Sequence, residues 1–537
     1  MRLVLSSIAV CVALTDTLSA QRLTPGLSAE SGVYAEAYSI ENRAARRPAQ
    51  SVRFYTSPTF SWLGMDIGTM LTWSTEDQFS TQTVNRYYVN PRWSWGQLHG
   101  GDYTPIVSRF TANAARVRGG GVELTPGRFR IMATGGLSQD ATEFSAFDAA
   151  PRRLMYAGLV GFGDPLGSFI ELSALRAADD TSGTDSLSVA PQENVVGTLS
   201  AGIAWKRLRL KGELGASLFS RDTRASELDS LSAPSAGDGV FTPRLSSRFD
   251  QVYSIDARVA LPAGSIGVQF EEIGPGFTTL GNPYLPNDVR DVRMAGSYRV
   301  LGGRLAGAAS VGARTDNLAG DKRGTTTRRT GTLALTMLNG NWLVSSVSLL
   351  MNGLTRDPAP LAPGTPDPGI IDSFRLRNVT SSIALVEQAR FSAAGLPQTI
   401  TLSATRQQVD DASPRYGELL DASATSLALD WSVTVAEQFT LSVQPAYERF
   451  IGAERDESFG SVGMGVSRRA PRSRWTASML ATHTQIENGS QLRGNASAGI
   501  RLTTRDQVGF TLRHSRVQGV AQPFNETIGS MRLTRRW

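Results

Sequence analysis

The chain has 537 residues, and its 54 Lys and Arg outnumber its 48 Asp and Glu, which gives a net charge of +6. A basic balance suits nucleic-acid binding, but no basic cluster is interleaved with aromatic residues, so we expect no nucleic-acid partner. The only cysteine, Cys11, leaves no possibility of an internal disulfide or a Cys-ligated metal cluster.

The first twenty residues have the features of a secretory signal peptide. Arg2 supplies the positive charge, residues 3–14 are apolar, and the small pair Ser19-Ala20 precedes the predicted cleavage point. The alternative is a buried N-terminal helix. We predict a signal peptide at 1–20 and one domain at 21–537. No later stretch approaches the ~20 apolar residues of a membrane helix, so the exported chain is either soluble or a closed barrel.

After the signal peptide, apolar and polar side chains alternate in segments of about ten residues, as in the strands of a membrane barrel. In the hairpin Val195–Phe219, one face of the second strand carries Leu208, Leu210 and Leu214, and the other carries Arg209, Lys211 and Glu213. The alternation alone does not separate a barrel from a soluble sandwich. The predicted early strands are 31–40, 50–57, 60–73, 84–95, 101–110 and 112–125, and about twenty more follow residue 127.

The connections favour the barrel. Short turns such as Lys206-Arg207 and Asn339-Gly340 alternate with longer polar connections at 179–193, 221–248, 274–290, 315–328, 353–373 and 409–424. This alternation is typical of a barrel with short periplasmic turns and long outer loops. We therefore predict an all-β, antiparallel, up-and-down transmembrane β-barrel of about 22–26 strands, with a lumen that holds water or a plug. Six tryptophans lie near predicted strand ends, where membrane-interface girdles form: Trp62, Trp73, Trp205, Trp342, Trp431 and Trp475.

The last strand ends on an aromatic residue. One of its faces carries Met531, Leu533 and Trp537, and the other carries Arg532, Thr534 and Arg536. A chain that ends this way resembles the outer-membrane β-barrel proteins of Gram-negative bacteria, although Arg535 stands where an aromatic or apolar residue is usual. The resemblance implies location in the cell outer membrane, contact with outer-membrane lipid and lipopolysaccharide, and recognition of Met531, Leu533 and Trp537 by the barrel-assembly machinery.

The strand residues predicted to face the lumen are mostly basic. They include Arg209, Lys211, Glu213, Asp256, Arg258, Glu271, Arg299, Arg501 and Arg513. A predominantly basic lumen conducts anions better than cations. The alternative is that these charges only pair across strands and keep the lumen wet. A long loop such as 221–248 or 353–373 is expected to narrow the mouth.

Three functions compete. The first is a porin-like passive channel for small polar or anionic solutes. The second is a structural or secretion-linked barrel that acts as a conduit or anchor for a partner. Residues 101–103 and 116–124 resemble a segment of fimbrial ushers, which favours this second function, but no periplasmic domain is predicted beside the barrel.

The third function, a lipid-side enzyme, rests on His483 and His514, which are predicted to face outward near the outer ends of two strands. His99 is expected in or beside a turn. No motif fixes a nucleophile, and no phosphate loop, dinucleotide fingerprint or metal-spaced His/Cys cluster occurs. We therefore expect no catalytic residue, no metal and no cofactor.

Overall fold

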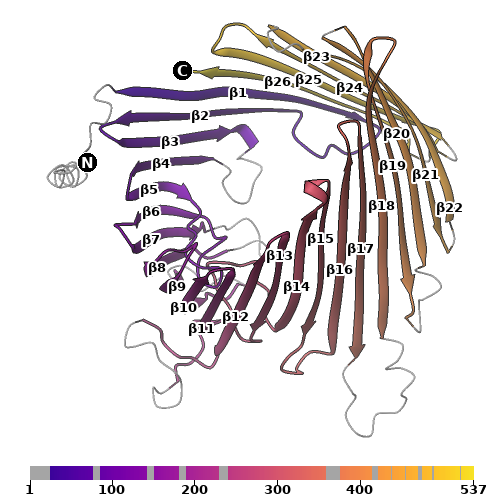
Figure 1. The fold of residues 1–537 in the computed structure, drawn as a ribbon. Coiled ribbons are helices and arrows are strands. Elements are labelled where there is room, and N and C mark those ends of the chain that lie inside the picture. The colour runs from indigo at the N-terminus through magenta and orange to yellow at the C-terminus, as the bar shows by residue number, and fades with distance from the viewer. Residues whose placement is uncertain are drawn as a thin grey trace.

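The computed structural model describes residues 25–76, 85–141, 150–180, 189–228, 240–358, 375–413, 421–436, 438–453, 455–469, 474–486, 489–520 and 522–537. The predicted signal peptide at 1–20 lies outside these residues. Within them, no helix has the length and apolar character needed to cross a membrane. The chain is built almost wholly of strands (Figure 1), and helical residues are confined to short segments such as the 3₁₀ turn Leu301–Gly303.

Twenty-six antiparallel strands form one sheet that closes on itself. Each strand pairs with the next along the chain, and β1 (Gly26–Glu41) pairs with β26 (Phe524–Arg536) from Glu30 opposite Arg536 to Glu41 opposite Asn525. Closure leaves no strand edge with unpaired backbone groups, which is the condition for a sheet to cross lipid. The predicted all-β, up-and-down barrel of 22–26 strands is confirmed.

The early strands are β2 (Gln50–Trp62), β3 (Met65–Ser74), β4 (Arg86–Trp93), β5 (Gly96–Tyr103) and β6 (Val117–Leu124). Two predictions were wrong here. The single strand expected at 60–73 is divided by a turn at Leu63-Gly64, where both residues have positive φ values of 50° and 76°. The strand expected at 101–110 ends at Tyr103, and residues 104–116 leave the sheet.

The twenty strands predicted after residue 127 are β7 to β26. They are β7 (Phe129–Gln139), β8 (Arg153–Gly163), β9 (Phe169–Asp179), β10 (Glu193–Trp205), β11 (Leu208–Ser220), β12 (Ser247–Leu261), β13 (Gly264–Ile273), β14 (Val289–Val300), β15 (Leu305–Asp316), β16 (Gly324–Asn339), β17 (Leu343–Pro358), β18 (Leu376–Ala393), β19 (Leu396–Asp411), β20 (Ala422–Ala436), β21 (Phe439–Gly452), β22 (Arg455–Arg468), β23 (Trp475–Ile486), β24 (Gly489–Arg501), β25 (Asp506–Gln518) and β26.

The connections at the two ends of the barrel differ in length. Short turns such as 63–64, 206–207 and 394–395 lie at one end, and both β1 and β26 have their chain-terminal ends there (Figure 1). Connections at the other end are longer as far as β20, whereas β21 and β22 are separated only by residues 453–454. The predicted alternation of short and long connections therefore ends after β20. We take the short-turn end as periplasmic.

The outer face of the barrel is apolar. Alternate residues of each strand point outward, and Val160, Leu172 and Leu214 are 60%, 62% and 59% exposed, although their strands are fully hydrogen-bonded. Exposed tryptophans gather at the periplasmic end, where Trp62, Trp205, Trp342, Trp475 and Trp537 lie, and Trp73 lies at the opposite end. An apolar band with interfacial aromatics matches a lipid-facing surface.

Candidate functional site

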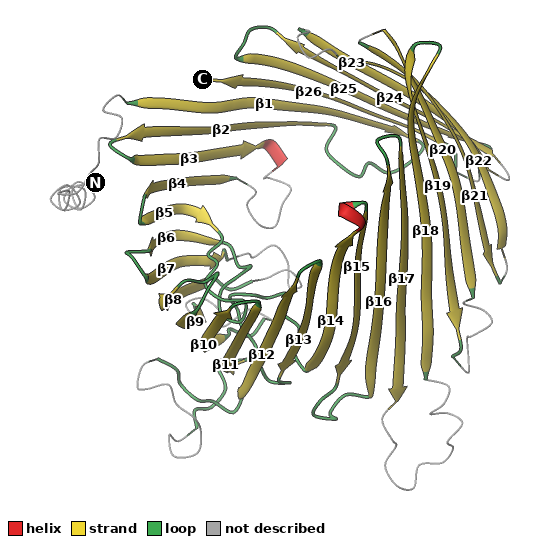
Figure 2. Ribbon diagram, in the orientation of Figure 1, coloured by secondary structure: helices red, strands yellow, loops and turns green. Residues whose placement is uncertain are grey.

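Two of the connections that the structure describes throughout fold into the lumen instead of lying over the barrel rim. We call residues 104–116, which join β5 to β6, and residues 274–288, which join β13 to β14, the inner loops. Figure 2 shows loop segments inside the ring beside β8–β13. The carbonyl of Gly281 accepts hydrogen bonds from the amides of Asn113, Ala114 and Ala115 at 3.0, 3.2 and 3.1 Å. The Thr279 hydroxyl donates to the carbonyl of Thr111 at 2.6 Å. The inner loops are therefore one folded unit.

Apolar side chains hold this unit against one wall of the lumen. Phe110 and Phe277 are both 1% exposed, and their rings meet edge to face at 6.3 Å between centroids. They belong to a buried cluster with inward residues of β8–β14, which include Met155, Leu175, Val196, Val252, Ile273 and Val289. Burial of a side chain of this size contributes about 1.5–3 kcal/mol. The strands under the inner loops therefore carry apolar residues on both faces.

Polar contacts fix the position of the inner loops. Arg109 forms an ion pair with Glu271, and its Nη2 donates to Oε1 at 2.9 Å. Ser108 hydrogen-bonds to Glu213. The fully buried Asn194 donates to the carbonyl of Thr278 at 2.9 Å and accepts from the amide of Leu280 at 3.0 Å. Both the nitrogen and the oxygen of this buried side-chain amide are hydrogen-bonded to the inner loop. The amide therefore fixes the position of the loop, because a displaced loop would leave these buried polar atoms without partners.

Glu213 and Glu271 were predicted to line the lumen. Both lie on its inner face, but they lie beneath the inner loops and anchor them, so they do not face open water. Sequence reasoning could not identify this role, because the anchoring partners are 105 and 162 residues away along the chain.

The predicted residues Arg209, Lys211 and Arg258 form a basic patch on the periplasmic side of the inner loops. Arg209 stands opposite Arg258 in the ladder of β11 and β12, and Lys211 stands opposite Asp256. The Lys211 ammonium lies 5.9 Å from the ring centroid of Phe169. Among the described residues, no ion pair within 4.0 Å involves these three cations or Asp256. Cross-strand pairing therefore does not neutralise the patch.

Three further predicted lumen residues lie apart from this patch. Arg299 is near the periplasmic end of β14, and its amide donates to the carbonyl of Ala263. Arg501 ends β24 opposite Gln507, and Arg513 of β25 stands between Asn495 and Ile528. The predicted arginines therefore lie on two separate parts of the wall.

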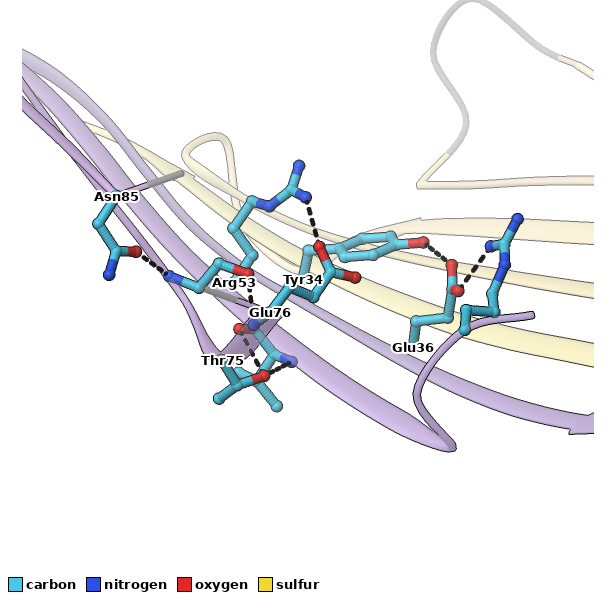
Figure 3. Close-up of polar contacts among 9 residues, drawn as sticks. Tyr34, Glu36, Arg53, Thr75, Glu76 and Asn85 are labelled. Atoms are coloured by element: carbon cyan, nitrogen blue, oxygen red, sulfur yellow. Dashed lines mark hydrogen bonds and ion pairs between the residues drawn. The ribbon is translucent and has the colours of Figure 1, made fainter. Parts of the chain in front are cut away.

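The closing seam holds a denser charge network. Arg536 binds Glu30 at 3.1 Å, and Arg532 donates to the Tyr55 hydroxyl at 2.7 Å. Nearby, Tyr34 donates to Glu36 at 2.6 Å, and Arg53 binds Glu76 at 3.1 Å (Figure 3). Glu30, which also lies 3.7 Å from Arg532, therefore offsets part of the charge of the terminal arginines inside the lumen.

On the outer face of the seam lie the predicted assembly residues Met531, Leu533 and Trp537, which are 41%, 40% and 52% exposed. The amide of Trp537 donates to the carbonyl of Ala29 at 2.9 Å. The Arg535 guanidinium, which departs from the usual terminal pattern, lies 4.1 Å from the centroid of the Trp537 ring.

The wall opposite the inner loops is unpacked. In the described chain beyond Val289, no apolar side chain is buried. The inward positions of β15–β24 are mainly hydroxyl, amide and alanine side chains; Thr332, Ser346, Thr401, Ser403, Ser426 and Gln444 are examples. A hydrophilic inner face without a packed core is a surface for water.

One aromatic feature inside the lumen was missed from the sequence. His99 was expected beside a turn, but it lies within β5, stacked on Tyr103 at 4.8 Å between ring centroids. The Tyr88 hydroxyl is 3.1 Å from its Nδ1. His99 and Tyr103 line, with Glu123 and Arg130, a recess of about 370 Å³ beside the inner loops. The prediction failed because the glycines after His99 continue the strand.

The two outer-face histidines lie where they were predicted. His483 stands between Val462 and Leu492 on the lipid side, and the His514 Nδ1 is 2.9 Å from the Thr527 hydroxyl. Ser515, a nearby hydroxyl in sequence, points to the lumen and contacts Gln491.

The loops expected to narrow the mouth are only partly described. The ends of the 221–246 connection bond to each other and to the neighbouring connection, through the amide of Leu228 to Pro243 and that of Thr223 to Pro191. Residues 359–374 lie outside the described residues.

No known protein family and no curated protein sequence matches the chain. Solved structures resemble it at low identity. The copper transporter OprC is 10% identical, covers 97% of this chain and 82% of its own, and has a TM-score of 0.39. The ferric enterobactin receptor PfeA of Pseudomonas aeruginosa is 9% identical, with coverages of 96% and 81% and a TM-score of 0.41.

The translocation pore of the P pilus usher PapC is 12% identical, with coverages of 95% and 99% and a TM-score of 0.38. Likeness at this level is confined to general barrel architecture. The closed sheet, the apolar exterior and the interfacial tryptophans of this chain identify it as an outer-membrane β-barrel protein.

Proposed function

We propose that this barrel is a passive channel for small polar solutes, with a preference for anions. The supporting observation is the contrast between its two walls. The inner loops fill the lumen along β8–β14, while the described inward positions of β15–β24 are mainly hydrophilic and bury no apolar side chain. A lumen that is filled along one wall leaves a water path along the other wall. The inner loops limit the width of this water path.

The anion preference rests on the basic patch of Arg209, Lys211 and Arg258. These cations lie on the periplasmic side of the inner loops. The nearby acids Glu213 and Glu271 contact Ser108 and Arg109 of the inner loops instead of these cations. Unpaired cations at a narrow part of a pore raise the local concentration of anions. The carboxyl groups at the seam do not offset this effect, because arginines pair with them.

A planar bilayer recording tests the proposal. The mature chain should give stable conductance steps, and in a salt gradient the reversal potential should indicate anion preference. Replacement of Arg209, Lys211 and Arg258 by Gln should shift the reversal potential toward cations with little change in step size. Arg406→Gln removes an exposed, outward charge of β19 and should change neither quantity. A folded barrel that stays silent would contradict the channel.

A conduit or anchor for a partner is the second candidate, and the strand number favours it. Barrels of 16–18 strands already hold an aqueous channel, so 26 strands exceed what small solutes require. Co-purification of a periplasmic or surface partner in stoichiometric amount, together with silent bilayers, would favour this alternative. We propose no catalytic role, since Ser515 lies on the opposite face of the barrel from His514.

A further inference from the structure

The outer face of the barrel has an apolar groove at the closing seam, independent of the lumen. It crosses β24, β25, β26, β1 and β2, which lie side by side in Figure 1, and it encloses about 590 Å³. Small side chains form its floor and larger apolar ones its walls. The floor is Ala35, Ala37, Ala496, Ala498 and Gly529, and the walls are Val52, Phe510, Leu512 and Met531.

Strand register brings these small residues together. Ala496 stands opposite Leu512, Leu512 opposite Gly529, and Gly529 opposite Ala37. The next row of outward side chains, two residues nearer the periplasmic end of each strand, runs through Ala498, Phe510, Met531, Ala35 and Val52. Because side chains at ladder positions share one face, the small residues Gly529, Ala37 and Ala35 of β26 and β1 leave a depression in an otherwise bulky apolar surface. Leu512 and Phe510 of β25 separate this depression from Ala496 and Ala498.

A basic site lies at the outer end of the same groove. His514 and Arg516 follow Leu512 on the outward face of β25, and Arg516 is about 13 Å beyond Leu512 at the usual rise of a strand. The guanidinium of Arg516 lies beside the side-chain amide of Gln518, which is uncharged. His483 lies two strands away across Leu492.

The other charged groups of this face leave the site basic. Glu41 is the nearest acid, and it accepts a hydrogen bond from Asn525 at 3.0 Å. Arg43, in the connection after β1, lies over the Phe524 ring at 4.6 Å and adds a further positive charge at the same end. The groove therefore has an apolar body and a cationic outer end, on a surface that faces lipid.

We propose that this groove binds lipopolysaccharide, with an acyl chain along the small-residue floor and a phosphate at Arg516 and His514. The long-loop end faces the outer leaflet, where that lipid carries its phosphates. Hydrocarbon fills an apolar depression that water would not, and a guanidinium is suited to bind phosphate through two parallel hydrogen bonds. This site is distinct from the lumen, so it does not depend on the proposed channel.

Two substitutions test the two ends of the site separately. Gly529→Leu fills the groove, and a Cβ at this position meets no atom within 4 Å, so the strand can accept it. Gly460→Leu is its control, because Gly460 also lies in a strand with open space and stands beside exposed Val462 in β22. Arg516→Gln removes the phosphate contact, and the outward Arg406→Gln is its control.

The measurement is native mass spectrometry of delipidated, refolded barrels incubated with purified lipopolysaccharide, after heat-modifiability has shown that each variant is folded. Gly529→Leu and Arg516→Gln should each lower retention about tenfold, as expected for the loss of one charge-assisted or well-packed contact, and both controls should bind as the natural chain does. Equal retention by all four variants would overturn the site. So would retention of phosphatidylcholine, or of phosphatidylglycerol, as strong as that of lipopolysaccharide.

Discussion

The walls of this barrel formed by β8–β14 and by β15–β24 are built from the same kind of strand, yet their inner faces differ. Under the inner loops, inward positions are buried, and many of them are apolar, as at Met155 and Val196. On the opposite wall they are mainly hydroxyl and amide groups in contact with solvent. The difference shows that a strand with apolar residues on both faces indicates a lumen wall covered by loops. A strand in which apolar and polar residues alternate indicates a lumen wall exposed to water.

The largest change in stability is expected when one phenylalanine from each wall is replaced by alanine and the two variants are compared. Phe110→Ala removes a ring that is 1% exposed from the inner loops, and it should destabilise them by about 3–5 kcal/mol. Phe450 faces the lumen from β21 and is 39% exposed, so Phe450→Ala should change stability by less than about 0.5 kcal/mol.

Hydrogen exchange gives the readout for this pair. The amides of Asn113, Ala114 and Ala115, which donate to Gly281, should lose protection in Phe110→Ala and keep it in Phe450→Ala. Equal protection in both variants would mean that the inner loops do not depend on this apolar cluster.

An intermediate effect is expected from the ion pair that joins the inner loops to β13. Arg109→Met leaves the Glu271 carboxylate, only 7% exposed, without its cation. Loss of one partner of a fully buried pair costs about 3–5 kcal/mol, and we expect about 2 kcal/mol here because Arg109 is half-exposed. Single-channel records should show added flicker as the loops detach. Arg449→Met, which breaks an exposed pair with Asp456, should leave the records quiet.

The smallest effect is expected from steric displacement at the contact between the inner loops. A Cβ at Gly281 would lie 2.4 Å from both Leu175 Cδ1 and the carbonyl oxygen of Thr111. Gly281→Ala should therefore cost about 1 kcal/mol, the lower end of the range for overpacking, and increase the mean conductance. Gly197→Ala, where a Cβ meets nothing within 4 Å, is the control. An unchanged conductance with Gly281→Ala would show that the inner loops do not limit the pore.

Much of the fold was predictable because a barrel strand repeats a local rule. Alternation of apolar and polar residues with a period of two predicted the twenty strands after residue 127 and the outward position of His483 and His514. The prediction failed at 104–116, whose apolar residues resemble a strand in sequence. Val107 and Phe110 are buried against the lumen wall instead, and local patterning cannot distinguish these two kinds of burial.

The local sequence specifies the alternation, the strand number within a narrow range and the apolar exterior, because each depends on residues close together along the chain. Which connections enter the lumen, how Glu213 and Glu271 anchor them, and how small residues of three strands line one outer groove become visible only in the folded barrel. These features depend on pairs such as Arg109 with Glu271 or Ala37 with Gly529, which strand register and closure bring together from distant parts of the chain.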